Sequence, residues 1–193
     1  MLKIESDKNK KEMLGVDIDE VVADFMGSFL DFYNSVSGKA YKKQDITRYE
    51  LWKVLNCTQS DLVSLIYEFH KTPFFKSIKP IEGSTKGIAF LKSKYRLHAI
   101  TSRQKEIVRE TTEWIEYYFK SCFESIEFTD DNALNRKLLK KSSVCNSLGI
   151  TTLIEDRDSY AEECANKGIR VILLDRPWNR KYKEGGLVKR VYG

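Results

Sequence analysis

Short apolar segments alternate with amphipathic segments along most of this chain, and this alternation restricts the fold more than any other feature. The apolar segments are typical of buried strands, and the amphipathic ones repeat their apolar residues at helical spacing. We expect strands at 13–18, 96–101, 123–128, 151–155 and 169–174, an edge strand at 187–192, and helices at 82–95, 104–120, 136–148 and 159–166. This alternation predicts an α/β fold, with a three-layer α/β/α, Rossmann-like core built on a parallel sheet.

One stretch interrupts the alternation between the first and second strands. The expected elements there are three helices and a proline-bounded connector, at 21–36, 46–55, 61–69 and 72–80. We therefore interpret residues 25–80 as a small helical cap inserted after the first strand, and residues 13–24 with 81–193 as the core domain. The charged residues 1–12 are expected to form a flexible N-terminus.

The composition excludes several classes of protein. Of the 193 residues, 41% are hydrophobic and 32% are charged, which is too apolar for a disordered chain. No apolar run approaches the ~18–20 residues that cross a membrane, and the charged start lacks the apolar core of a signal peptide. The four cysteines have neither zinc nor disulfide spacing. We expect a cytoplasmic protein without a membrane partner, whose net charge of +5 suits an anionic ligand or simply a soluble surface.

Polar side chains follow three of the expected strands. They are Asp17, Asp19, Thr101, Ser102, Glu155 and Asp156, and Lys141 lies in the helix before the fourth strand. Alone, each of these groups is usually a turn, a helix cap or a solvated surface. Because parallel sheets bind ligands at the carboxyl ends of their strands, their joint occurrence in this order predicts one shared site.

The chemistry open to this set of residues is narrow. Carboxylates from two strands form a hard, oxygen-rich site that suits Mg²⁺. A lysine and a hydroxyl beside it would bind phosphoryl oxygens, so the residues favour phosphoryl transfer. One aspartate can attack phosphorus, and the other can protonate the leaving oxygen and later take a proton from water.

At this point the chain resembles the phosphatases of the haloacid dehalogenase superfamily. Asp17-Ile18-Asp19-Glu20-Val21 is similar to the first motif of that superfamily, Thr101 to the second, Lys141 to the third and Glu155-Asp156 to the fourth. Within the superfamily, the segment 17–25 and the position of the insertion resemble the 5′(3′)-deoxyribonucleotidase family.

The resemblance implies a role for each matching residue. Asp17 would be the nucleophile, and Asp19 the general acid and base whose backbone carbonyl joins Asp17 and Asp156 on Mg²⁺. Glu155 would stand beside these ligands or contact a bound water. Thr101, Lys141 and Ser102 would hold the phosphate, and Phe25 matches an aromatic side chain of the family's base pocket.

Three positions depart from the family pattern. Glu20 stands where many relatives have glycine, and Arg103 stands where the eukaryotic enzymes have proline, so Arg103 could meet a second anionic group of the substrate. The segment 177–180 is more similar to bacterial and viral relatives. Among the aromatic residues of the expected cap, Phe25, Trp52 and Phe75 are our candidates for stacking on a nucleobase.

Several alternatives stay open. The leading prediction is a Mg²⁺-dependent phosphomonoesterase acting on nucleoside monophosphates. The same chemistry could serve a sugar phosphate or a polynucleotide 3′-phosphate, with nucleic acid the less favoured partner. A non-catalytic module that binds a phosphorylated ligand is less favoured still, because both aspartates of the first motif are present. Whether the protein forms a homodimer is left open by the sequence.

Overall fold

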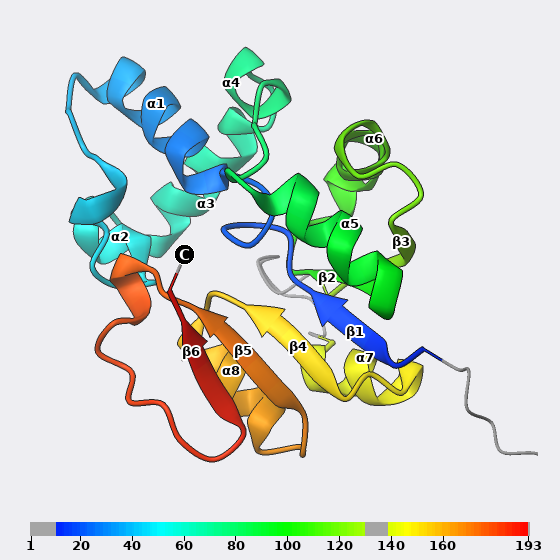
Figure 1. Ribbon diagram of the computed structural model, residues 1–193. Helices are drawn as coiled ribbons and strands as arrows, with labels where there is room; N and C mark the ends of the chain where they lie inside the picture. The colour runs from blue at the N-terminus through cyan, green and yellow to red at the C-terminus, as the bar shows by residue number, and fades with distance from the viewer. Residues whose placement is uncertain (1–10, 130–138, 193) are drawn as a thin grey trace, which may run out of the picture.

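The computed structural model describes residues 11–129 and 139–192 and contains a six-stranded parallel sheet (Figure 1). The strands are β1 (Met13–Val16), β2 (Arg96–Thr101), β3 (Phe123–Phe128), β4 (Thr152–Glu155), β5 (Arg170–Leu174) and β6 (Val188–Val191). Their order is β3-β2-β1-β4-β5-β6, so β1 lies between the strands that carry the second and fourth motifs. All neighbouring pairs are parallel, which brings the carboxyl ends of the strands to one edge.

Helices cover both faces of this sheet, which confirms the predicted α/β/α architecture. The covering helices are α5 (Ser84–Lys94), α6 (Val108–Tyr118), α7 (Lys141–Leu148) and α8 (Asp158–Ala165). Ile88 of α5 and Ile115 of α6 belong to the apolar cluster on one face. Val144 of α7 and Ala161 of α8 belong to the cluster on the other. The central strands β1, β2 and β4 are therefore largely buried from both sides, as expected for a parallel sheet, whereas the edge strands β3 and β6 keep exposed residues.

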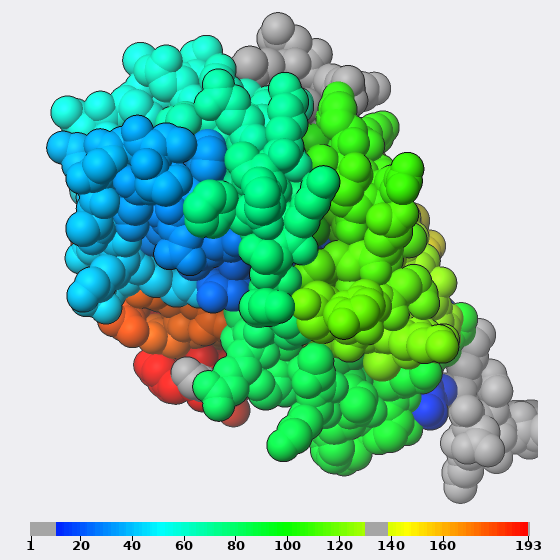
Figure 2. Space-filling model, turned by 90° about the horizontal axis from the view of Figure 1, so that it is seen from above, coloured from blue at the N-terminus to red at the C-terminus, as the bar shows by residue number. Residues whose placement is uncertain are grey.

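The insertion after β1 is helical, as predicted. It contains α1 (Phe25–Ser37), a 3₁₀ turn at Lys43–Asp45, α2 (Leu51–Val54), α3 (Gln59–Phe69) and α4 (Pro73–Lys76). These elements lie together beyond one end of the sheet (Figure 1). In the view from above, they form one continuous surface with α5 and α6, and they lie against the orange segment that follows β5 (Figure 2).

Three elements of the insertion differ from the prediction. The first helix begins at Phe25 and not at position 21, because the Asp24 side chain accepts a hydrogen bond from the Gly27 amide and caps the helix there. Glu20 has a positive φ of 61°, so the backbone turns before the helix starts. The helix predicted over 46–55 is a single turn, α2, and the connector predicted over 72–80 contains the short helix α4.

The chain leaves the core and returns to it through two connecting segments that are hydrogen-bonded to each other. The Asp24 amide donates to the Lys79 carbonyl, and the Ile81 amide donates to the Val22 carbonyl, both at 2.9 Å. Ala23 and Pro80 form an antiparallel bridge between these two hydrogen bonds. This pairing ties the two ends of the insertion together at the edge of the sheet where the motif residues stand.

Two predicted segments fall partly outside the described residues. These are the flexible terminus at 1–12 and the helix at 136–148, of which α7 begins at Lys141 and ends before Gly149 (φ 71°). No helix in the described ranges is both long enough and apolar enough to span a membrane.

Candidate active site

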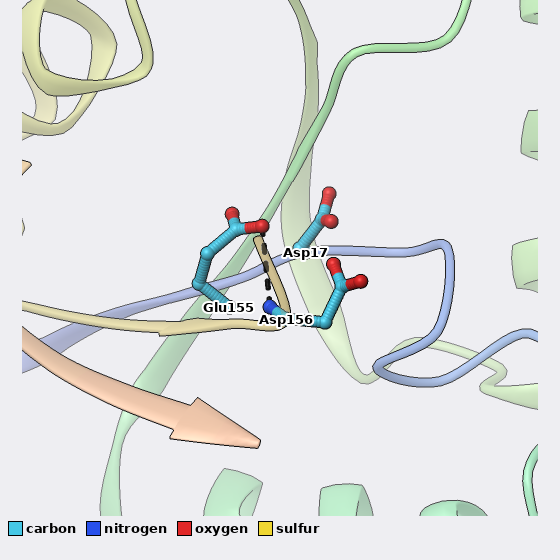
Figure 3. A group of neighbouring side chains, drawn as sticks. All are labelled: Asp17, Glu155 and Asp156. Atoms are coloured by element: carbon cyan, nitrogen blue, oxygen red, sulfur yellow. Dashed lines mark hydrogen bonds between the residues drawn. The ribbon is translucent and has the colours of Figure 1, made fainter. Parts of the chain in front are cut away.

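Three carboxylates converge where β1 and β4 end. Asp17 follows β1, and its amide donates to the Ile154 carbonyl at 3.0 Å, so this residue still follows the direction of the sheet. Glu155 ends β4 and Asp156 follows it. One carboxylate oxygen from each of these residues lies within 4.8 Å of the others (Figure 3). All three residues are buried.

Lys141 is the cation that contacts this cluster among the described residues. Its Nζ lies 2.8 Å from Asp17 Oδ1 and 2.7 Å from Glu155 Oε2. Burial alone would lower the pKa of Lys141, but the two carboxylates outweigh burial and raise it. Burial and the charge of Glu155 raise the pKa of Asp17 to about 7. The lysine is therefore firmly charged, whereas the negative charge of the cluster is only partly compensated.

Glu155 acts as an acceptor for protein donors on both of its oxygens. Oε2 accepts from Lys141, and Oε1 accepts from the backbone amides of Asp156 and Arg157 at 3.2 and 3.0 Å. The side chain thus shapes the turn after β4 and fixes the lysine. Glu155 thus lies beside Asp17 and Asp156, and its expected place in the shell around metal ligands stays a prediction.

Asp156 is held by the segment that follows β5. The indole Nε1 of Trp178 donates to Asp156 Oδ2 at 2.9 Å, and Asn179 Nδ2 donates to the Asp156 carbonyl at 2.6 Å. Arg190 of β6 in turn donates to the Asn179 side-chain and backbone oxygens. Burial and the charge of Glu155 raise the pKa of Asp156.

The donor set fits a magnesium ion. Mg²⁺ prefers hard oxygen ligands and is usually bound through one or two carboxylates. Three buried carboxylates with a single contacting lysine leave uncompensated negative charge, which a divalent cation would neutralise. Asp17 and Asp156 each offer an oxygen toward the same point, as Figure 3 shows.

Asp19 does not join this cluster through its carboxylate. Arg103 Nε lies 3.1 Å from both of its oxygens, and Arg103 Nη2 donates to Oδ1 at 2.7 Å. We predicted that Arg103 could meet a second anionic group of the substrate. In the structure this side chain is already paired with Asp19. The sequence suggested no contact between these two residues.

Two of the predicted phosphate ligands stand at the end of β2, whereas Lys141 begins α7. Thr101 is fully buried, and its hydroxyl accepts from the Arg103 amide at 3.2 Å. The Ser102 hydroxyl lies 3.3 Å from that of Thr129 and donates to the Tyr160 hydroxyl at 3.2 Å. β2 is hydrogen-bonded to β1, so these hydroxyls and Asp17 belong to neighbouring strand ends.

A cavity of about 150 Å³ lies between the sheet and the insertion. Asp17, Asp19 and Asp156 line it from the core, and Phe25 and Trp52 line it from the insertion. Phe75, the third aromatic candidate, is outside this lining. Its ring is buried in the apolar cluster at 5.7 Å from the Arg103 guanidinium.

Further residues at the cavity were not predicted as part of the site. The Arg157 guanidinium lies 3.9 Å from the ring centre of Tyr49, in the insertion, and 4.1 Å from that of Tyr160, in the core. His70 also lines the cavity, and burial lowers its pKa to about 4. The segment 177–180 stood out in the sequence, but nothing there indicated that Trp178 contacts Asp156.

Comparisons with known proteins agree with this geometry. Residues 11–189 match the family described as 5′ nucleotidase, deoxy (Pyrimidine), cytosolic type C protein. A relative from Halalkalibacterium halodurans, named "Putative nucleotidase BH1399", is 28% identical over 172 residues, which are 89% of this chain and 83% of the relative. A 5′(3′)-deoxyribonucleotidase of Bacillus subtilis is 24% identical over 111 residues, which are 56% of this chain and 62% of that protein.

A solved structure supports the fold. The haloacid dehalogenase-like hydrolase SP0104 of Streptococcus pneumoniae has a TM-score of 0.62 at 11% identity, over 86% of this chain and 85% of that one. The resemblance expected from the motifs is thus confirmed by an independent match over nearly the whole chain. The chain belongs to the 5′ nucleotidase, deoxy (Pyrimidine), cytosolic type C family and is a hydrolase of phosphomonoesters.

Proposed function

We propose that this hydrolase acts on nucleoside monophosphates with Mg²⁺ bound, through an aspartyl-phosphate on Asp17. The observation that carries the proposal is the buried contact of Lys141 with Asp17. Asp17 belongs to the floor of the cavity, with Asp19 and Asp156, and Phe25 and Trp52 belong to its roof. The family description and the relative named a 5′(3′)-deoxyribonucleotidase support a nucleotide as the substrate.

The substrate would bind with its phosphate on the floor and its nucleoside under the roof. Lys141, Thr101 and Ser102 supply a charge and hydroxyl groups for the phosphoryl oxygens. Phe25 and Trp52 supply apolar surface on which a base can stack. A bound Mg²⁺, held by Asp17, Asp156 and the Asp19 carbonyl, would lower the repulsion between the Asp17 carboxylate and the phosphate.

The first step transfers the phosphoryl group to the protein. An Asp17 carboxylate oxygen forms a bond to phosphorus while the bond from phosphorus to the leaving oxygen breaks. Asp19 gives its proton to that oxygen, and the nucleoside leaves as an alcohol. Lys141 stabilises the charge on the phosphoryl oxygens during transfer.

The second step restores the free enzyme. Asp19, now a carboxylate, takes a proton from a water molecule as the water oxygen attacks phosphorus. The bond between phosphorus and the Asp17 oxygen breaks, and inorganic phosphate is released. Residues 25–80 form the cap in this proposal, which would exclude bulk water while the aspartyl-phosphate exists.

A substrate panel tests the proposal. We would measure phosphate release from nucleoside monophosphates, sugar phosphates and a 3′-phosphorylated oligonucleotide, with Mg²⁺ and with EDTA. The expected result is release that needs Mg²⁺ and is fastest for a nucleoside monophosphate. Faster release from a sugar phosphate or the oligonucleotide would contradict the substrate class and retain the chemistry. Equal release in EDTA would contradict the magnesium requirement.

A further inference from the structure

Arg103 is a buried arginine whose whole guanidinium is engaged at the wall of the cavity. Its side chain is only 4% exposed, whereas that of its partner Asp19 is 29% exposed. Three nitrogen–oxygen contacts of 2.7–3.1 Å join the two side chains. The carboxylate is therefore fixed from behind by the arginine and still reaches the cavity that it lines.

Two further elements hold the arginine in place. Nη1 donates to the Thr111 hydroxyl of α6 at 3.2 Å. On another side, the guanidinium carbon lies 5.7 Å from the ring centre of Phe75 in α4. A planar guanidinium with several fixed partners has little freedom to rotate, so it imposes one orientation on the carboxylate that it binds. A lysine, with a single point charge, would not impose that orientation.

We propose that Arg103 is a positioning residue, which holds the Asp19 carboxyl group in the orientation from which Asp19, in its protonated form, gives its proton to the leaving oxygen. The inference rests on the proposed function, in which Asp19 is the general acid. Its chemical consequence is specific to the leaving group. A sugar hydroxyl leaves as a strongly basic alkoxide unless it receives a proton, whereas a nitrophenolate leaves readily without one.

The test compares two leaving groups in single turnovers, so that only the first step is observed. The substrates are the best alkyl phosphate found in the panel and p-nitrophenyl phosphate. The main variant is Arg103→Lys, which keeps the charge and loses the planar donor pair. Thr111→Val removes one anchor of the arginine and leaves its contact with Asp19. Arg109→Lys, on the exposed face of α6, is the matched control.

We expect Arg103→Lys to slow release of the alkyl leaving group at least tenfold more than release of nitrophenolate. We call this difference between the two leaving groups the split. Thr111→Val should show a smaller split, and Arg109→Lys should show none. A merely structural role of Arg103 would slow both substrates equally, and that result would overturn the inference. Faster release of the alkyl group would also overturn it, because Arg103 would then be withholding Asp19 from the substrate.

Asp19→Asn separates this inference from the function on which it rests. If Asp19→Asn shows the split and Arg103→Lys does not, only the positioning role fails. If Asp19→Asn shows no split, the general-acid assignment fails, and the inference fails with it. A wild-type chain that hydrolyses no phosphate ester would contradict both. Thermal melting of each variant checks folding, and Thr111→Val keeps the test decisive if Arg103→Lys does not fold.

Discussion

The floor and the roof of the cavity are built in opposite ways. The floor consists of charged side chains at the ends of adjacent strands, and each of them contacts a specific protein group. The roof consists of aromatic and aliphatic side chains from short helices, and Phe25 and Trp52 line it by apolar surface. A sheet edge fixes positions closely, whereas apolar packing tolerates substitution of similar volume.

Under the proposed function, this difference would separate reaction from selectivity. Groups that transfer a phosphoryl group must be placed within a fraction of an ångström, and the hydrogen-bonded strand ends provide that placement. A base bound by stacking needs surface and not exact direction. We therefore expect changes in the floor to abolish catalysis for every substrate, and changes in the roof to alter the preference among substrates.

Replacing Asp17, the proposed nucleophile, should give the largest effect. Asp17→Asn replaces the charged carboxylate by a neutral amide of the same volume, whose oxygen is a poor nucleophile, so turnover should fall at least about 10³-fold for all phosphate esters. Phosphate release measures the fall in turnover, and a thermal melt checks that the variant is folded. Turnover close to that of the wild-type protein would mean that Asp17 is not the nucleophile.

Removing Lys141, the lysine that contacts the floor, should give the next largest effect. Lys141→Met should slow turnover about 100-fold, because a group that stabilises the phosphoryl oxygens is lost. Without added metal at pH 8, the free energy of unfolding should fall by about 3–5 kcal/mol, because a buried ion pair is broken. Urea unfolding and phosphate release measure the two effects.

Lys140→Met is the matched control for that variant. Lys140 precedes the helix and is exposed, so neither quantity should change. If the Lys140 and Lys141 variants behave alike, the contacts of Lys141 with Asp17 and Glu155 carry no function.

The same contrast explains what the sequence could predict. The strands at 96–101 and 123–128 match the prediction at both ends, because polar residues flank both segments. Asp17 and Asp156 directly follow a strand and Thr101 ends one, so the sequence alone predicts that all three stand at one edge of the sheet. The start of the first helix of the roof was harder to predict. Val21 and Val22 fit the helical spacing of the residues that follow, but the backbone turns at Glu20 and the helix begins only at Phe25.

Contacts between distant residues could not be derived from local patterns. Arg103 and Asp19 are 84 positions apart, and Trp178 and Asp156 are 22 apart. Neither pair has a spacing that any helix or strand period would reveal. Only the strand order, which places β5 beside β4 and β2 beside β1, brings these partners together.

Replacing Trp178, which donates a hydrogen bond to Asp156, should weaken metal binding although the proposed ligand Asp156 is kept. Trp178→Phe deletes the hydrogen bond to Asp156 and keeps an aromatic ring, so the affinity for Mg²⁺ should fall about tenfold. Titration calorimetry with Mg²⁺ alone measures this without substrate. In the control Trp114→Phe, the lost donor served the Ile78 carbonyl, and Mg²⁺ affinity should stay unchanged. Equal affinities in both variants would show that Trp178 only fills space.

A roof variant should have the smallest effect, and only on part of the substrate panel. Trp52→Ala removes a stacking surface worth about 1 kcal/mol, so KM for nucleoside monophosphates should rise about fivefold with little change in kcat. KM for a small aryl phosphate should hardly change, because that substrate does not reach far under the roof. Phe90→Ala, an exposed aromatic residue of α5, is the control. If Trp52→Ala raises KM equally for both substrates, then Trp52 supports the packing of the insertion and does not contribute to the selectivity among substrates.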